Sequence, residues 1–137
     1  MAASDRAKKP ATVSLHSIRA LAVRFADALE ARDLAAIADC YAPEFRVWHN
    51  FDRLEKTRSE SLAMLEAGFE RSAARHYVER RIHVFPSGYV QQHVIVNRRK
   101  DGNVVRTPAA IVCDVKDGKI ARIDEYIDIF ALKAFSS

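Results

Sequence analysis

The second half of the chain is divided by three turn signals that recur at similar spacing. Pro86-Ser87-Gly88, Asp101-Gly102 and Asp117-Gly118 separate stretches rich in β-branched and aromatic residues. Such short Gly-containing signals mark hairpin turns, and β-branched and aromatic residues favour strands. We therefore predict four strands in meander order, over residues 77–85, 89–98, 104–115 and 120–129.

The first part of the chain has a helical period instead. Apolar residues recur at intervals of three and four from Ile18 to Leu29, which predicts an amphipathic helix over residues 15–31, capped by Ser14 or Ser17. Asp33 is placed to cap a second, short helix. That helix would include Leu34, Ile37 and Tyr41 and would end before Pro43.

One strand and one helix are predicted between these two regions. The segment FRVWHNF, residues 45–51, is rich in aromatic and β-branched residues and predicts the first strand. Thr57 and Glu60 have the spacing of a capping box, and the helix that follows would bury Leu62, Leu65 and Phe69. This order of elements indicates an α+β fold with a cone-shaped, curved sheet, mixed or antiparallel, and three N-terminal helices packed around an apolar pocket.

Length and cysteine usage limit the organisation of the chain. Its 137 residues suit one domain, which we assign to residues 14–137, after a small, polar and basic segment, residues 1–13, that we interpret as a flexible tail rather than a secretory signal. No apolar run approaches the roughly 20 residues that a membrane-spanning helix needs, so we expect no membrane partner. Cys40 and Cys113 lie in apolar contexts without a CxxC pair, which predicts free thiols and a cytoplasmic location.

Charge and motif content argue against several classes of partner. The net charge is +4, but three of the basic residues fall within residues 6–9 and the others are interleaved with acidic residues, so we predict no nucleic-acid partner. His16, His76 and His83 show no metal-ligand spacing, and a chain with four glycines has no phosphate-binding glycine loop. We therefore expect neither a metal nor another cofactor.

Three segments of the chain resemble the nuclear transport factor 2-like superfamily, which includes ketosteroid isomerases, limonene epoxide hydrolases and SnoaL-like polyketide cyclases. They are FADALEARDLAAIADCYAPEF, VWHN and DGKIARIDEYID, and the resemblance covers residues 15–132. It implies a cone-shaped sheet around a pocket for a small molecule. It does not choose a reaction, because the superfamily contains isomerases, dehydratases, cyclases, hydrolases and noncatalytic binding modules.

Matching single residues within this resemblance removes two mechanisms. Ketosteroid isomerases build an oxyanion hole from a tyrosine and an aspartic acid, and the matching positions here are Phe25 and approximately Ile111. Limonene epoxide hydrolases use an Arg-x-Asp pair and a further aspartic acid, and the matching positions are Val94, Val96 and Glu125. Only the last of these carboxylates remains.

The same match predicts which side of strand 89–98 faces the pocket. Side chains alternate along a strand, so if Val94 and Val96 face the pocket, Gln92 faces it too and His93 faces away.

The Trp48-His49-Asn50 segment leaves two alternatives open. An ungapped match to the isomerases places His49 at their general base, whereas a match of the tripeptide to the epoxide hydrolases places Trp48 and Asn50 in the pocket. The two differ by one residue and therefore by sheet face. The register of Glu125 is similarly open, opposite Ala110 after a tight turn or opposite Ala109 after a one-residue bulge.

Glu125 is the strongest candidate for chemistry. It lies between Ile123 and Ile127 on an apolar strand face, where a carboxylate is costly unless it is paired or protonated. The leading hypothesis is a cofactor-independent acid–base enzyme, an isomerase, dehydratase or cyclase acting on a small apolar cyclic or carbonyl compound. Its catalytic candidates are Glu125, His49 and Asn50, and its ligand-binding candidates are Trp48, Phe25, Leu29, Gln92, Val94, Val96 and Ala109.

Two alternative functions and one partner complete the expectations. The alternatives are a noncatalytic ligand-binding or association domain and an epoxide hydrolase with altered machinery. Asp124, Tyr126 and Asp128 alternate on the face opposite to Glu125, and we expect this outer sheet face to form a homodimer contact.

Overall fold

The computed structural model describes residues 14–136, with side chains through Ala131 and at Lys133, so the tail predicted for residues 1–13 lies outside the described residues. The elements are α2 (Leu15–Ala31), α3 (Leu34–Cys40), β1 (Tyr41–His49), β2 (Glu55–Thr57), α4 (Arg58–Arg71), β3 (Ser72–Phe85), β4 (Gly88–Arg99), β5 (Val104–Lys116), β6 (Lys119–Ile127) and α5 (Ile129–Ser136). The predicted α+β class and the meander order of the last four strands are confirmed.

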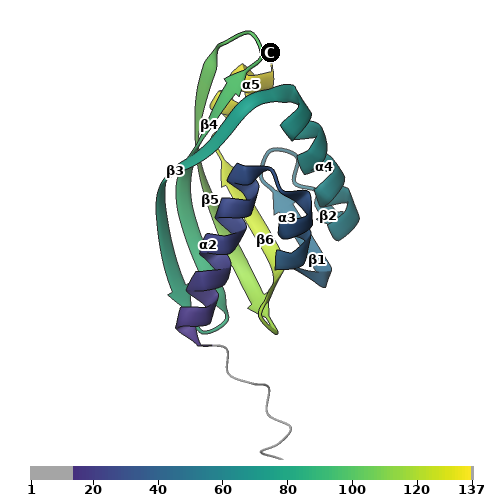
Figure 1. Ribbon diagram of the computed structural model, residues 1–137, viewed down its shortest axis with the longest axis vertical. Coiled ribbons are helices and arrows are strands. Elements are labelled where there is room, and N and C mark those ends of the chain that lie inside the picture. The colour runs from purple at the N-terminus through teal and green to yellow at the C-terminus, as the bar shows by residue number, and fades with distance from the viewer. Residues whose placement is uncertain (1–13, 137) are drawn as a thin grey trace, which may run out of the picture.

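The six strands form one open, mixed sheet in the order β2-β1-β6-β5-β4-β3. β1 runs parallel to β6, and the other neighbouring strands are antiparallel. Figure 1 shows the long strands β3, β4 and β5 curving beside α2, while α3 and α4 lie on the side of β1 and β2. The helices and the sheet therefore enclose a common interior.

Local caps set the helix boundaries. The Ser14 side chain accepts a hydrogen bond from the backbone N–H of Ser17, and α2 ends at Arg32, which adopts the left-handed conformation. The Asp33 side chain caps α3 by accepting from the N–H of Ala36. The capping box of Thr57 and Glu60 is also present, with both of its hydrogen bonds.

The strand β3 begins at Ser72, five residues before its predicted start, and both ends of β1 also differ from the prediction. Tyr41 was assigned to the second helix but begins β1, where it pairs with Ile120 and its ring stacks on Phe45 with centroids 3.7 Å apart. Long-range strand pairing thus overrides the local helical period at Tyr41. At the other end β1 stops at His49, so Asn50 lies in the following turn instead of in the strand.

The C-terminal segment forms a helix that the sequence analysis missed. We predicted a strand over residues 120–129 and three helices, whereas β6 ends at Ile127 and α5 follows, giving four helices within residues 14–136. The Asp128 side chain accepts hydrogen bonds from the backbone N–H groups of Phe130 and Ala131, which caps this helix. An aspartate before an apolar run was the available signal.

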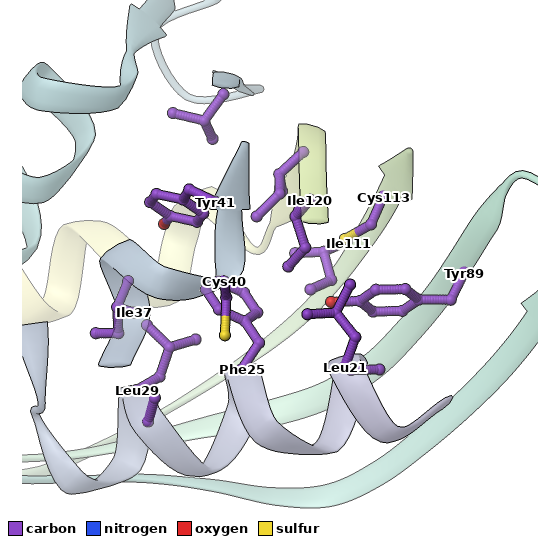
Figure 2. Packing of buried hydrophobic residues seen from close by; sticks show 14 of the residues in the cluster. Leu21, Phe25, Leu29, Ile37, Cys40, Tyr41, Tyr89, Ile111, Cys113 and Ile120 are labelled. Carbon is purple, nitrogen blue, oxygen red and sulfur yellow. The ribbon is translucent and has the colours of Figure 1, made fainter. Parts of the chain in front are cut away.

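The main core lies between α2 and the sheet. Leu21, Phe25 and Leu29 of α2 point toward residues of the strands, including Tyr89 and Ile120 (Figure 2). Cys40 and Cys113 are buried free thiols in the same cluster, and burial raises the pKa of both. No helix within residues 14–136 combines the length and apolar character needed to cross a membrane.

Candidate functional site

A cavity of about 410 Å³ opens between the helices and the concave face of the sheet. This volume is within the range of about 300–1,000 Å³ that is usual for small-molecule sites. Its wall is mainly apolar. Residues from α2, α4 and all of the long strands contribute to it, among them Phe25, Leu29, Val47, Phe51, Met64, Leu65, Ile95, Ile111, Ile123 and Ile127.

His49 and Glu125 form a close pair in this wall. His49 Nε2 lies 3.2 Å from Glu125 Oε1, and the two side chains are 6% and 21% exposed. They are cross-strand partners in the parallel β1–β6 pairing, which puts both side chains on the same sheet face. Among the cavity-lining residues of the described chain, Glu125 is the only carboxylate.

The register of Glu125 differs from both sequence expectations. Glu125 lies opposite Ile111, instead of opposite Ala110 or Ala109. The shift occurs between Asp114 and Val115, where the extra residue is on β6. The bulge that we considered had placed the extra residue on the opposite strand.

The structure distinguishes the two alternatives for the Trp48-His49-Asn50 segment. His49 faces the cavity, whereas Trp48 lies on the other sheet face, where its ring packs 5.4 Å from that of Tyr126. Asn50 does not line the cavity. Its side chain instead donates to the backbone oxygen of Ile127 and accepts from the backbone N–H of the same residue, at 3.1 and 3.0 Å.

The predicted orientation of β4 is reversed in the structure. His93, Ile95 and Asn97 line the cavity, while Gln92, Val94 and Val96 alternate with them on the other face. The burial of Tyr89 agrees with this orientation of β4. Tyr89 is completely buried in the core, and His93, four residues later, lies on the same strand face. The match of Val94 and Val96 to the epoxide hydrolases predicted the opposite orientation. Hydrophobicity did not argue against it, because both faces of β4 are partly apolar.

The remaining ligand-binding candidates also have definite positions. Phe25 and Leu29 line the cavity, as expected from their place on α2. Ala109 is buried but borders a separate hollow, which Gln92 and Val94 also line. Ala109 faces inward from β5, but it lies outside the wall of the main cavity.

Several polar cavity residues were missed by the sequence analysis. Gln91 Nε2 donates to His93 Nδ1 at 3.2 Å, so the neutral His93 ring carries its proton on Nε2, which is buried without a partner in the described structure. The ring of Tyr77 meets His93 edge-on, with centroids 5.4 Å apart. Burial lowers the pKa of His93 and raises that of Tyr77.

The polar residues of β4 offered a signal in the sequence. Gln91, His93 and Asn97 share one strand face. Polar groups spaced by two on a central strand mark either a solvated face or the lining of a site. Within residues 14–136, no group of three or more His, Cys, Asp or Glu side chains is placed to hold a metal ion.

Solved structures share this fold, an open mixed sheet curved over helices, and one of them is an NTF2-like protein from Burkholderia xenovorans. A candidate polyketide cyclase from Xanthomonas campestris pv. campestris aligns over 90% of this chain and 100% of its own, with a TM-score of 0.81 and 16% identity. AclR, a candidate hydroxylase from Streptomyces galilaeus, aligns over 88% of this chain and 85% of its own, with a TM-score of 0.79 and 15% identity.

A protein of ketosteroid isomerase-like fold from Catenulispora acidiphila, solved with trimethylamine, aligns over 85% of this chain and 91% of its own, with a TM-score of 0.75 and 13% identity. The family model of the SnoaL-like domain matches residues 22–123. The chain therefore belongs to the SnoaL-like domain family. No curated protein matches it significantly in sequence.

Proposed function

We propose that this protein binds a small, mainly apolar molecule in its cavity and transfers a proton on it through Glu125. The observation that carries the proposal is the His49–Glu125 pair, which lies in a mainly apolar wall. His49 Nε2 lies 3.2 Å from Glu125 Oε1, so the imidazole is placed beside one oxygen of the carboxylate.

The second oxygen of Glu125 is available for the bound molecule. Within residues 14–136, His49 is the only side chain paired with the Glu125 carboxylate. Its free oxygen accepts a proton from a carbon next to a carbonyl, or from a hydroxyl, and returns that proton at another atom. Isomerases, dehydratases and cyclases share this step, and no cofactor is needed for it.

His93 supplies a second polar group to the proposed site. Its Nε2–H is buried and unpaired within the described residues, and its lowered pKa keeps the ring neutral. A neutral donor beside the cavity stabilises negative charge that develops on a substrate oxygen. His93 therefore assists the proton transfer that Glu125 performs.

The cavity does not favour an epoxide hydrolase. Val94 and Val96, which match the Arg-x-Asp pair of those enzymes, face away from the cavity. If the Arg-x-Asp pair is matched one residue earlier, it corresponds to His93 and Ile95, which line the cavity. Neither side chain replaces an arginine or an aspartate. A noncatalytic binding domain remains as an outcome of the test below.

The test is a screen of enones and hydroxylated polycyclic compounds with the wild type, Glu125→Gln and Asp124→Asn. Asp124 is a matched control because it precedes Glu125 and faces Arg122, to which it is hydrogen bonded, instead of the cavity. We expect Glu125→Gln to lower turnover by about a hundredfold to ten-thousandfold and Asp124→Asn to leave it near the wild-type level. Equal turnover in all three proteins would exclude proton transfer by Glu125, and binding without turnover in the wild type would indicate a noncatalytic domain.

We also propose that the outer face of β5 and β6 forms a homodimer contact. Val112 and Tyr126 are large apolar residues with 36% and 49% exposure, and Trp48 packs against Tyr126. Sedimentation of the wild type, of Tyr126→Glu and of the control Val23→Glu tests this contact, since Val23 is an exposed apolar residue on α2 instead of on β5 or β6. We expect only Tyr126→Glu to become monomeric, and a monomeric wild type would refute the contact.

The cytoplasm is the compartment that we propose for this protein. The support is that Cys40 and Cys113 are both free and buried, a state that a reducing compartment maintains. Cell fractionation checks this, and recovery of the protein outside the cytoplasm would contradict it.

A further inference from the structure

The cavity wall has a cationic region that proton transfer by Glu125 does not use. Arg71, the last residue of α4, and Arg75 of β3 both line the cavity. Arg75 is half-buried, whereas Arg71 is exposed. Their guanidinium groups give a mainly apolar cavity a local positive charge.

Arg75 is held in place by neutral partners. Its Nε donates to Asn97 Oδ1 at 2.7 Å, and Asn97 is itself buried with 4% exposure. The guanidinium carbon lies 5.9 Å from the ring centroid of Phe69. Gly68 stands beside the same group, and a Cβ added there would lie 3.6 Å from Arg75 Nη2. Because Gly68 has no side chain, the helix leaves room next to the guanidinium.

The positive charge of this region has no counter-ion in the described structure. Other arginines form ion pairs, such as Arg80 with Asp27 and Glu30, but within residues 14–136 neither Arg71 nor Arg75 pairs with a carboxylate. A half-buried guanidinium beside an apolar space is costly unless an anion compensates it. The planar guanidinium is also well suited to bind a carboxylate through two parallel hydrogen bonds.

The cationic region and the His49–Glu125 pair lie at different levels of the sheet. Arg75 pairs with Asn97 across β3 and β4, whereas Glu125 is opposite Ile111, which pairs with Gln91. Asn97 and Gln91 are six residues apart on β4, or about 20 Å of extended strand before the sheet curvature and the reach of the side chains are subtracted. An anion at Arg75 therefore does not sit against the Glu125 carboxylate.

We propose that the ligand of this cavity is an apolar carboxylic acid, whose carboxylate binds Arg75 with assistance from Arg71 and whose other end reaches Glu125. This inference rests on the proposed function of the cavity and adds the substrate class. A carboxylate fits better than a phosphate, because the wall around the two arginines is mainly apolar and offers few further donors to a third oxygen.

The test compares an acid with its uncharged isostere. N-phenyl-1-naphthylamine, whose fluorescence rises in apolar surroundings, reports occupancy of the cavity, and 1-naphthylacetate and 1-naphthylacetamide compete with it. We expect the wild type to bind the acid about tenfold or more tightly than the amide, as a hydrogen bond to a charged group implies. We expect Arg75→Met to remove this preference and to leave the affinity for the amide and the dye unchanged.

Arg98→Met is the matched control. Arg98 is exposed, follows Asn97 on β4 and does not line the cavity, so this variant should keep the preference for the acid. Should Arg75→Met fail to fold by circular dichroism, Arg75→Lys, which keeps the charge but loses the planar fork, is expected to reduce the preference severalfold.

Four results overturn the inference. Equal affinity of the wild type for acid and amide refutes it while leaving the cavity and proton transfer intact. If the folded Arg75 variant still prefers the acid, or if Arg98→Met loses this preference, the carboxylate does not bind at Arg75. If the dye does not bind the wild type, the cavity is not a binding site for apolar molecules, and the proposed function is refuted as well.

Discussion

The side chain of Asn50 provides a direct test of whether this residue acts in chemistry or in architecture. It extends the pairing of β6 beyond the end of β1, donating to the Ile127 oxygen at 3.1 Å and accepting from the Ile127 N–H at 3.0 Å. Its own backbone N–H donates to the backbone carbonyl oxygen of Glu125 at 3.0 Å. Asn50 therefore holds the segment of β6 that carries the candidate catalytic carboxylate.

Asn50→Ala removes both side-chain hydrogen bonds and keeps the backbone bond. At about 1 kcal/mol for each bond, we expect the free energy of unfolding to fall by about 2 kcal/mol. With a urea dependence of about 1–3 kcal/mol per molar, the midpoint of unfolding should fall by roughly 1 M. Fluorescence of Trp48, the single tryptophan, follows the transition.

Asn50→Asp tests the two side-chain hydrogen bonds separately, because it keeps one and removes the other. The carboxylate still accepts from the Ile127 N–H but faces the Ile127 carbonyl without a donor, so this variant should be destabilised as well. Both variants should bind N-phenyl-1-naphthylamine as the wild type does when they are folded, because Asn50 does not line the cavity. If Asn50→Ala were as stable as the wild type and yet lost turnover, Asn50 would be a catalytic residue instead of a structural one.

Four further substitutions test the backbone, a cap and a buried histidine. Gly88→Ala would place a Cβ 1.9 Å from the backbone oxygen of Cys113 and is expected to lower the free energy of unfolding by about 3 kcal/mol or more. Gly68→Ala, whose Cβ would have its nearest contact at 3.6 Å, should instead raise the free energy of unfolding by about 0.5–1 kcal/mol. Equal melting temperatures of the two variants would contradict this. Thr57→Ala removes the capping box and should cost about 1 kcal/mol in urea unfolding, so an unchanged midpoint would argue against the cap. Burial lowers the pKa of His93 from its usual 6.5, so the unfolded chain takes up this proton at a higher pH than the folded protein does, and stability falls as the pH drops through about 6.5. The variant His93→Gln should lose less stability over the same pH range, and parallel pH profiles would count against the shift.

Local patterns were sufficient to predict most of the elements of this fold. The helix over residues 15–31 follows from its apolar period and its cap, and the hairpins follow from Asp101-Gly102 and Asp117-Gly118. These features depend on hydrogen bonds and side chains a few residues apart, so the sequence contains them directly. The helix after Asp128 was predictable by the same means, but the preceding strand pattern concealed it.

The faces of the strands were not predictable in the same way. A shift of one residue exchanges the two faces of a strand, and where both faces are partly apolar, as on β4, hydrophobicity does not choose between them. In the structure His93 faces inward and Val94 faces outward, in agreement with the burial of Tyr89 in the core. The extra residue on β6, which sets Glu125 opposite Ile111, likewise has no marker in the sequence.

The sequence by itself determined the class of fold, the order of its principal elements and the choice of Glu125 as the leading catalytic candidate. Only the tertiary structure decided that His49 is its partner, that Asn50 and Trp48 lie outside the cavity, and that Arg75 enters it. Helices and turns depend on neighbours along the chain, whereas a site depends on the pairing of distant strands, where one residue of register moves a side chain from the cavity to the opposite face.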